Sequence, residues 1–330
     1  MRKPNYESSE VSPSPVWPPQ AAYDLETLVG HHESVRFLRA NMNRFDSGTF
    51  LLTGPSGIGK RLSVWFLMRE FLCESKQERI CLKCPSCKSL SQRQHISVLE
   101  ILPEGAVITV EETEKIIQFV SLRGLSTKQF VIIDEAHLLN HQSGNKLLKT
   151  LEEPPKNVFF VLITSQKSRV LKTIQSRSQI VRFHPLSPEQ LRKIFPRVAL
   201  ETLVRARGSV ARVLELEDPD TKRRLEFAKS VWTQMDNPDF LTEFPWREDW
   251  KSRETFQILL ESWEMELVEQ IYLTKSKENI LSKESVFEKT TLFQEIQKLR
   301  DAVLAKNADP ILALESFWVS LRRVHEGVHA

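Results

Sequence analysis

A glycine-rich segment that ends in lysine is the clearest chemical signal in the sequence. Residues 54–60 read G-P-S-G-I-G-K and fit the pattern G-x-x-x-x-G-K. An apolar run precedes the segment and a helix-like pattern follows it. Glycines let backbone amides turn toward a phosphate, and the lysine adds positive charge at the start of the helix. The segment therefore predicts a phosphate-binding loop. The expected nucleotide-binding residues are Gly54, Gly57, Gly59 and Lys60.

The next residue departs from the pattern, because Arg61 stands where the motif has Ser or Thr. That hydroxyl normally binds the Mg²⁺ that bridges the terminal phosphates. Ser63 does not replace it, since two residues along an α-helix rotate the side chain by about 200°. ATP could still bind through the loop amides and Lys60, but its Mg²⁺-dependent hydrolysis is expected to be impaired.

The apolar run of residues 130–134 ends in a carboxylate, and the next residue carries a second one. In a sheet that carries a phosphate loop, the first such carboxylate holds Mg²⁺ and the second can polarise the attacking water. Asp134 and Glu135 are therefore the catalytic candidates of a degenerate site. The alternative is a buried strand that ends in a solvated acidic turn. His137 is expected to be packed or solvated rather than catalytic.

All four cysteines lie within a span of fifteen residues, in the pattern C-x7-C-x2-C-x2-C. Four thiolates with no open position are typical of a structural, tetrahedral zinc site. A loop this small buries little apolar surface, so metal binding would supply its folding energy. The predicted zinc ligands are Cys73, Cys81, Cys84 and Cys87. Free or disulfide-paired cysteines and a redox-active C-x-x-C are the alternatives. The clustering suits a reducing compartment and predicts a cytoplasmic protein.

Strand-like and helix-like segments alternate between about residues 25 and 183, which predicts an α/β fold with a parallel sheet. The expected strands are 50–53, 98–102, 130–134, 158–164 and 180–183. After Pro185, helix starts at Ser187 and near Gly208 predict a small helical domain.

The last hundred residues show amphipathic helical periodicity, which favours the core of a helical domain over exposed partner helices. One apolar stripe comprises Phe256, Leu259, Leu260, Trp263, Leu267, Val268 and Ile271. A final helix is expected to begin at the cap Asp309, with Pro310 next. Its expected apolar side comprises Leu312, Leu314, Phe317, Trp318 and Leu321.

Composition and charge narrow the classes of function that are open to the protein. The 330 residues carry 46 basic and 43 acidic side chains, and a net charge of +3 is too small to require nucleic acid. No apolar run approaches the roughly 18 residues of a membrane span. Prolines, serines and charges in the first 20 residues predict a disordered leader without a secretory signal. The predicted parts are this leader (1–20), a nucleotide-binding domain (21–184) with a zinc module (73–87), a lid (185–226) and a C-terminal helical domain (227–330).

The order of the motifs resembles the bacterial DNA polymerase III clamp-loader AAA+ family. Residues 145–155 read N-K-L-L-K-T-L-E-E-P-P, and Thr164 begins a segment similar to the family's sensor one. Residues 173–178 are similar to its S-R-C motif, and residues 208–212 to its sensor-two turn. The resemblance covers about residues 25–216, and the remaining residues match only as a helical domain.

The resemblance implies a fold and a role. Such subunits have a P-loop domain, a helical lid and a C-terminal collar. They form a hetero-oligomeric, pentameric ring that loads a sliding clamp on primed DNA. Delta-prime subunits of this family are often poor ATPases that lend the S-R-C arginine, here Arg177, to a neighbour's nucleotide. Thr164 and Arg212 would be nucleotide contacts of the chain's own site. Ser178 replaces the usual Cys, which leaves Arg177 in place.

Two other functions stay open at this point. A motor ATPase of the gamma/tau type is disfavoured by Arg61 and would show turnover on its own. A zinc-containing DNA-binding protein with a relic nucleotide fold would show steeply salt-dependent DNA affinity. The sequence does not indicate whether nucleotide binds at all, or which surfaces meet the clamp or DNA.

Overall fold

The computed structural model describes residues 28–75, 80–103, 105–121, 128–223, 225–226 and 283–325, and short stretches between 256 and 267. The chain divides into two compact units, residues 1–213 and 214–330. The expected leader, residues 1–20, lies outside the described residues.

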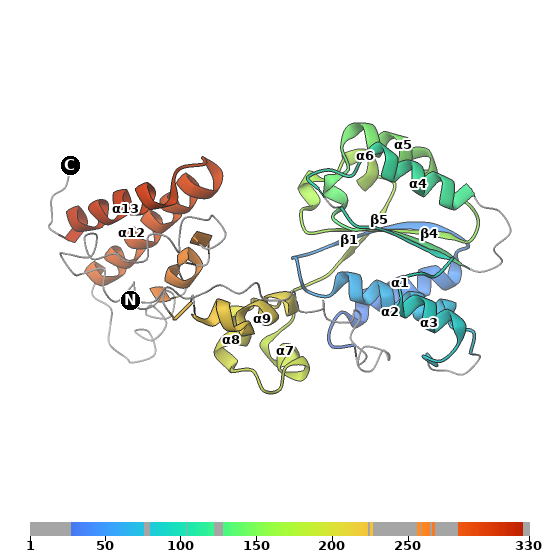
Figure 1. The fold of residues 1–330 in the computed structure, drawn as a ribbon, viewed down its shortest axis with the longest axis horizontal. Coiled ribbons are helices and arrows are strands. Elements are labelled where there is room, and N and C mark those ends of the chain that lie inside the picture. Colours follow the sequence, from blue (N-terminus) through green and yellow to red (C-terminus); the bar gives the residue numbers. More distant parts are fainter. Residues whose placement is uncertain are drawn as a thin grey trace, which may run out of the picture. The chain divides into compact units, whose positions relative to one another are not determined.

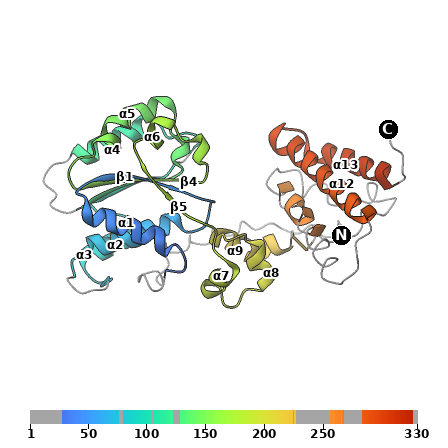
Figure 2. The same cartoon turned by 180° about the vertical axis from the view of Figure 1, so that it is seen from behind.

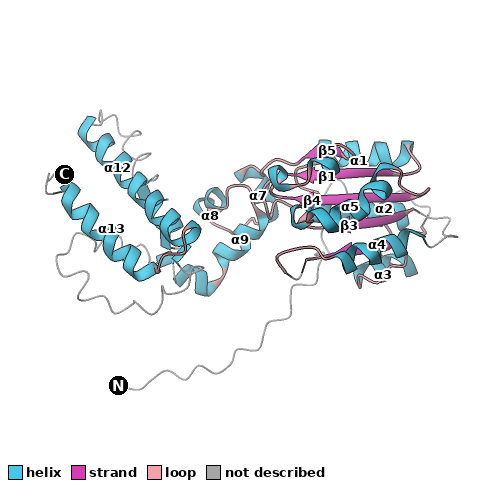
Figure 3. Cartoon of the chain, turned by 90° about the horizontal axis from the view of Figure 1, so that it is seen from above, coloured by secondary structure: helices cyan, strands magenta, loops and turns pink. Residues whose placement is uncertain are grey.

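The first unit is built on a five-stranded parallel sheet in the order β2-β3-β4-β1-β5 (Figures 1 and 3). The strands are β1 (Gly48–Thr53), β2 (Val98–Ile101), β3 (Gln129–Ile133), β4 (Val158–Thr164) and β5 (Gln179–Arg182). Every residue of β3 and β4 is buried. A parallel strand covered on both faces reads as a continuous apolar run, which explains why the sequence predicted the central strands β1, β3 and β4.

Helices cover both faces of the sheet (Figures 1 and 2). One face carries α1 (His32–Arg44), α2 (Lys60–Leu72) and α3 (Pro85–Ser91). The other carries α4 (Val110–Ser121), α5 (His141–Glu152) and α6 (Lys172–Gln175). Side chains alternate along the strands, so Phe50 and Leu52 join the core under α2 whereas Leu51 joins the core under α5.

The carboxyl ends of the central strands meet at one edge, where ligands of open α/β sheets bind. There β1 leads into the glycine-rich loop, and β3 leads through Asp134 into the short 3₁₀ helix η1 (Ala136–Leu138). The end of β4 lies beside β1, because Thr53 pairs with Thr164. A second 3₁₀ helix, η2 (Lys167–Arg169), follows β4.

Three short helices follow the sheet: α7 (Pro188–Ile194), α8 (Leu200–Arg205) and α9 (Val210–Glu217). Ser187 caps α7 in a reciprocal capping box with Gln190, which confirms the predicted helix start.

The second unit is helical where it is described. It contains α12 (Lys283–Arg300), a π-helical turn (Asp301–Ala305) and α13 (Pro310–His325). The backbone amides of Ile311 and Leu312 donate to Oδ1 of Asp309 at 3.0 Å, so the predicted cap is present. The buried residues of this core are Phe256, Leu259, Leu260, Trp263, Leu267, Ile296, Leu299, Val303, Leu314, Phe317 and Trp318.

The prediction for Leu312 was wrong, because its side chain is 65% exposed. Leu312 lies two residues before the buried Leu314, and a rotation of about 200° puts it on the opposite face of α13. Val268, Ile271 and the side chain of Leu321 lie outside the described residues. Among the described helices, none is long and apolar enough to cross a membrane.

Candidate functional site

The glycine-rich loop joins β1 to α2, and its lysine bonds to the loop itself. Gly59, at φ 100°, is the N-cap of α2, a conformation that favours glycine. Lys60 is buried, and its Nζ donates to the carbonyls of Gly54 at 2.7 Å and Pro55 at 2.5 Å. Burial lowers the pKa of Lys60, while the nearby carboxylates of Glu135 and Asp134 oppose that shift. The ammonium expected to meet phosphate is thus engaged by the carbonyls of the loop.

Arg61 contacts the carboxylate that was expected to hold Mg²⁺. Its Nη1 donates to Oδ2 of Asp134 at 3.2 Å. The other oxygen, Oδ1, accepts the backbone N–H of Glu135 at 3.0 Å. The Nε of Arg61 also lies 3.8 Å from Oε1 of Glu100 on β2. A guanidinium therefore sits against Asp134 as a fixed cation, where the Ser or Thr of a P-loop would leave room for a metal ion.

The second candidate carboxylate, Glu135, belongs to a polar cluster between the ends of β3 and β4. Glu135 has a left-handed backbone, at φ 44°. Its Oε2 accepts from Oγ of Ser165 at 3.3 Å and lies 3.2 Å from Nδ1 of His137. His137 Nδ1 also lies 3.1 Å from Oγ1 of Thr164. His137 is only 6% exposed at its side chain, so it is packed, as expected.

The start of α9 docks on the loop. The carbonyl of Gly57 accepts the N–H groups of Val210 at 2.9 Å and Ala211 at 3.2 Å. Gly57 has φ 71°, and a Cβ at this position would lie 2.3 Å from Oγ of Ser209. The loop therefore requires glycine here to admit the lid. Arg212 lies in the first turn of α9, next to this contact.

Sequence reasoning missed His31, which also supports the loop. Its Nε2 lies 2.7 Å from the carbonyl oxygen of Ile58, and since a carbonyl only accepts, Nε2 carries the proton. The ring packs on Phe183 with centroids 4.9 Å apart. Burial lowers the pKa of His31. No signal in the sequence distinguishes His31 from the neighbouring His32.

Arg177 lies away from this loop, in the turn between α6 and β5. Its Nε donates to Oε2 of Glu152 at 2.8 Å, and its Nη1 to the carbonyl of Thr173 at 3.3 Å. These partners belong to the helices on the sheet face opposite α2 (Figure 1). The side chain of Arg177 is 31% exposed. Ser178 donates its Oγ to the carbonyl of Ile174 at 2.8 Å, so this serine stabilises the turn that presents Arg177.

The four cysteines meet as predicted. The sulfurs of Cys73, Cys81, Cys84 and Cys87 all lie within 4.8 Å of one another. Zn–S bonds of about 2.3 Å in a tetrahedron place sulfurs about 3.8 Å apart, so the cluster can hold a metal ion such as zinc. Backbone amides donate to three of the sulfurs at 3.3–3.5 Å. The amides of Lys83 and Cys84 lower the pKa of Cys81 to about 6, whereas burial raises that of Cys87.

The fold and the site together define a P-loop protein of the AAA+ class. Residues 33–187 match the family described as DNA polymerase III, delta subunit. The DNA polymerase III subunit delta' of Bacillus subtilis is 32% identical over 191 residues, 56% of each chain. A subunit gamma of Buchnera aphidicola is 34% identical over 155 residues, 46% of this chain and 42% of that protein. These matches support membership of the clamp-loader AAA+ family for the part of the chain that they cover.

One solved structure is similar in fold over more of the chain than these sequence matches cover. A DNA polymerase III gamma subunit-related protein of Thermotoga maritima aligns with a TM-score of 0.51 at 16% identity, over 88% of this chain and 99% of that one. This match concerns the fold alone. The chain spans about half the length of the curated relatives that it matches.

Proposed function

We propose that this chain is a delta-prime-like subunit of the bacterial DNA polymerase III clamp loader. In this role it assembles with other loader subunits into a hetero-oligomeric ring, helps to place the sliding clamp on primed DNA, and acts in the cytoplasm. It presents Arg177 to the nucleotide of a neighbouring ATPase subunit. Its own phosphate loop turns over ATP poorly or not at all.

The hydrogen bond from Arg61 to Asp134 is the main support for a role other than that of a motor subunit. Phosphoryl transfer at a P-loop needs Mg²⁺ held by the loop hydroxyl and the acidic strand end. Here that hydroxyl is missing, and the carboxylate is paired with Arg61 in the first turn of α2, directly after the loop. A nucleotide that brought Mg²⁺ would have to displace this guanidinium first. The bonds of Lys60 to the loop carbonyls and of α9 to Gly57 support the same conclusion.

The setting of Arg177 suits an arginine that acts on a neighbour. Glu152 and Arg177 are both partly exposed, at 56% and 31%. Ion pairs of this kind contribute about 0.2–1 kcal/mol, so the arginine can leave Glu152 for a phosphate at little cost. An arginine finger stabilises the charge on the transferring phosphoryl group and is worth about 10³ to 10⁵ in rate.

Zinc would serve the structure rather than the reaction. The four cysteines would bind it through all four positions, which leaves none open for substrate or water. Cys84 caps α3 and Cys87 lies within it, so the metal would anchor this helix.

Reconstitution tests the proposal. The isolated chain should show ATP turnover at the background level, whereas a loader that contains it should hydrolyse ATP and load the clamp. Omitting the chain should abolish loading. Substantial turnover by the isolated chain would instead identify a motor subunit of the gamma/tau type. Tight, steeply salt-dependent DNA binding by the isolated chain would favour a DNA-binding protein.

A further inference from the structure

Glu100 is a largely buried acid in an otherwise apolar strand. It lies on β2, and its side chain is 10% exposed. Glu100 pairs in register with Ile132, which belongs to the core under α2, so its carboxylate points toward α2 rather than α5. A carboxylate this well buried is costly unless cations and hydrogen bonds compensate it.

Both carboxylate oxygens have partners. Oε1 accepts from the indole Nε1 of Trp65 at 3.3 Å and lies 3.8 Å from Nε of Arg61. Oε2 lies 3.7 Å from Nη1 of Arg93. Arg61 and Trp65 are four residues apart on α2 and so share one helix face. Glu100 thus lies between two arginines, one from the phosphate-loop helix and one from the segment after α3.

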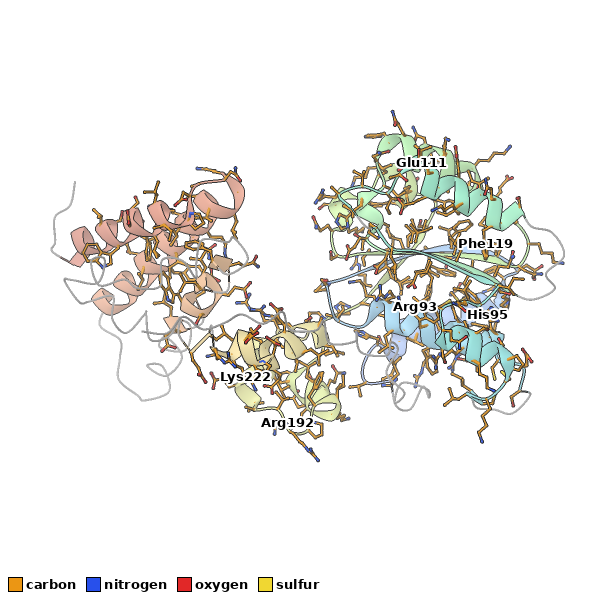
Figure 4. The ribbon with its side chains drawn as sticks, viewed as in Figure 1. Arg93, His95, Glu111, Phe119, Arg192 and Lys222 are labelled. Atoms are coloured by element: carbon orange, nitrogen blue, oxygen red, sulfur yellow. The ribbon has the colours of Figure 1, made fainter. Side chains whose placement is uncertain are left out.

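The second arginine belongs to the cysteine module, which is defined here as residues 80–93 with Cys73. Arg93 has a left-handed backbone, and its N–H donates to the carbonyl of Leu90, the last turn of α3. The guanidinium lies over the ring of Trp65, 6.0 Å from its centroid. Figure 4 shows Arg93 among the helices on the α1 and α2 side of the sheet. Since Cys84 and Cys87 hold the start of α3, the position of Arg93 depends on the cysteine cluster.

We propose that Glu100 is a positioning residue that links the cysteine module to Arg61. Arg93 fixes the Glu100 carboxylate, the carboxylate fixes Arg61, and Arg61 then stays on Asp134. Two arginines and two carboxylates alternate along this chain of contacts, so their charges balance. Metal loading of the module therefore keeps the cation position at Asp134 filled. The inference deepens the proposed function, because it rests on Arg61 acting as the fixed cation of the chain's own site.

The test measures how well the Arg61 side chain is protected from exchange with water in the full-length, isolated chain. The exchange rate of its Nε proton with water is measured by NMR on ¹⁵N-labelled protein, with the resonance assigned by its loss in Arg61→Lys. In the wild type, removing the module's metal with a chelator should speed exchange by about tenfold, the scale of one charge-assisted contact. Glu100→Gln and Arg93→Gln should each show this fast exchange with or without metal.

Glu70→Gln is the matched control. Glu70 is also on α2 and pairs with Arg39 at 2.8 Å, so this variant removes a comparable ion pair without touching Arg61. It should respond to the chelator as the wild type does. Slow exchange in Glu100→Gln, or a wild type insensitive to metal removal, would overturn the link. Fast exchange in the metal-loaded wild type would also overturn the link, because the Nε proton faces Glu100. The proposed function would fail separately, through substantial ATP turnover by the same isolated chain, because that function depends on the contact of Nη1 with Asp134.

Discussion

Replacing Arg177 with Ala should lower the ATP turnover of a reconstituted loader by about 10³-fold or more, if its motor subunits stay unchanged. The charge that develops on the transferring phosphoryl group would lose its guanidinium partner. The chain's fold should survive, because Arg177 makes surface contacts only, to Glu152 and to the backbone of Thr173. The measurement is steady-state hydrolysis in the presence of clamp and primed DNA.

Arg169→Ala is the control for this experiment. Arg169 is an exposed arginine of η2, eight residues earlier, whose Nη1 donates to Gln166. It has the same charge as Arg177 but is not part of the segment similar to S-R-C. Its replacement should leave turnover within about twofold of the wild type, as is usual for an exposed side chain. An equal loss in both variants would show a general effect of surface charge rather than a trans arginine.

Loss of the metal should lower the free energy of unfolding more than any of the other proposed substitutions does. The double variant Cys84→Ser with Cys87→Ser should release zinc, because two of four thiolates are gone. Structural zinc sites bind with about 10–16 kcal/mol, and that free energy contributes to folding. A loss of only about 2 kcal/mol would lower the Tm of the α/β unit by roughly 4–8 °C. Metal analysis and calorimetry measure the two quantities.

The neighbouring Lys88→Ala is the control for the cysteine variant. Lys88 lies in α3 between Cys87 and the end of the helix, and it is exposed. Its replacement should leave the zinc content and the Tm unchanged. Wild-type protein that purifies without stoichiometric metal, or a double variant as stable as the wild type, would show that the cluster is not a structural zinc site.

The fold could largely be predicted because its signals are local. Strands β3 and β4 are buried along their whole length and read as apolar runs. The cysteines lie close in sequence, so their spacing alone indicated that they meet. Helix caps at Ser187 and Asp309 are equally local, because the capping side chain bonds to backbone within three residues.

The candidate site could be predicted only in part, because its decisive contacts join distant residues. The missing hydroxyl at Arg61 was evident, but its bond to Asp134 spans 73 positions. The pairing of Arg177 with Glu152 spans 25. Glu100 did leave a signal in the sequence, because it is an acid inside an apolar run. A buried strand carries an acid only when cations or hydrogen bonds compensate its charge. His31 left none, since its contact depends on how α1 meets the loop.

Nucleotide binding by the isolated chain, with and without Mg²⁺, tests most directly whether Arg61 occupies the cation position. In the wild type, Mg²⁺ should leave the ATP affinity unchanged, because the guanidinium already pairs with Asp134. Arg61→Thr restores the missing hydroxyl, and its ATP affinity should rise by about tenfold or more with Mg²⁺. A wild type whose affinity rises with Mg²⁺ as strongly as that of Arg61→Thr would contradict the account.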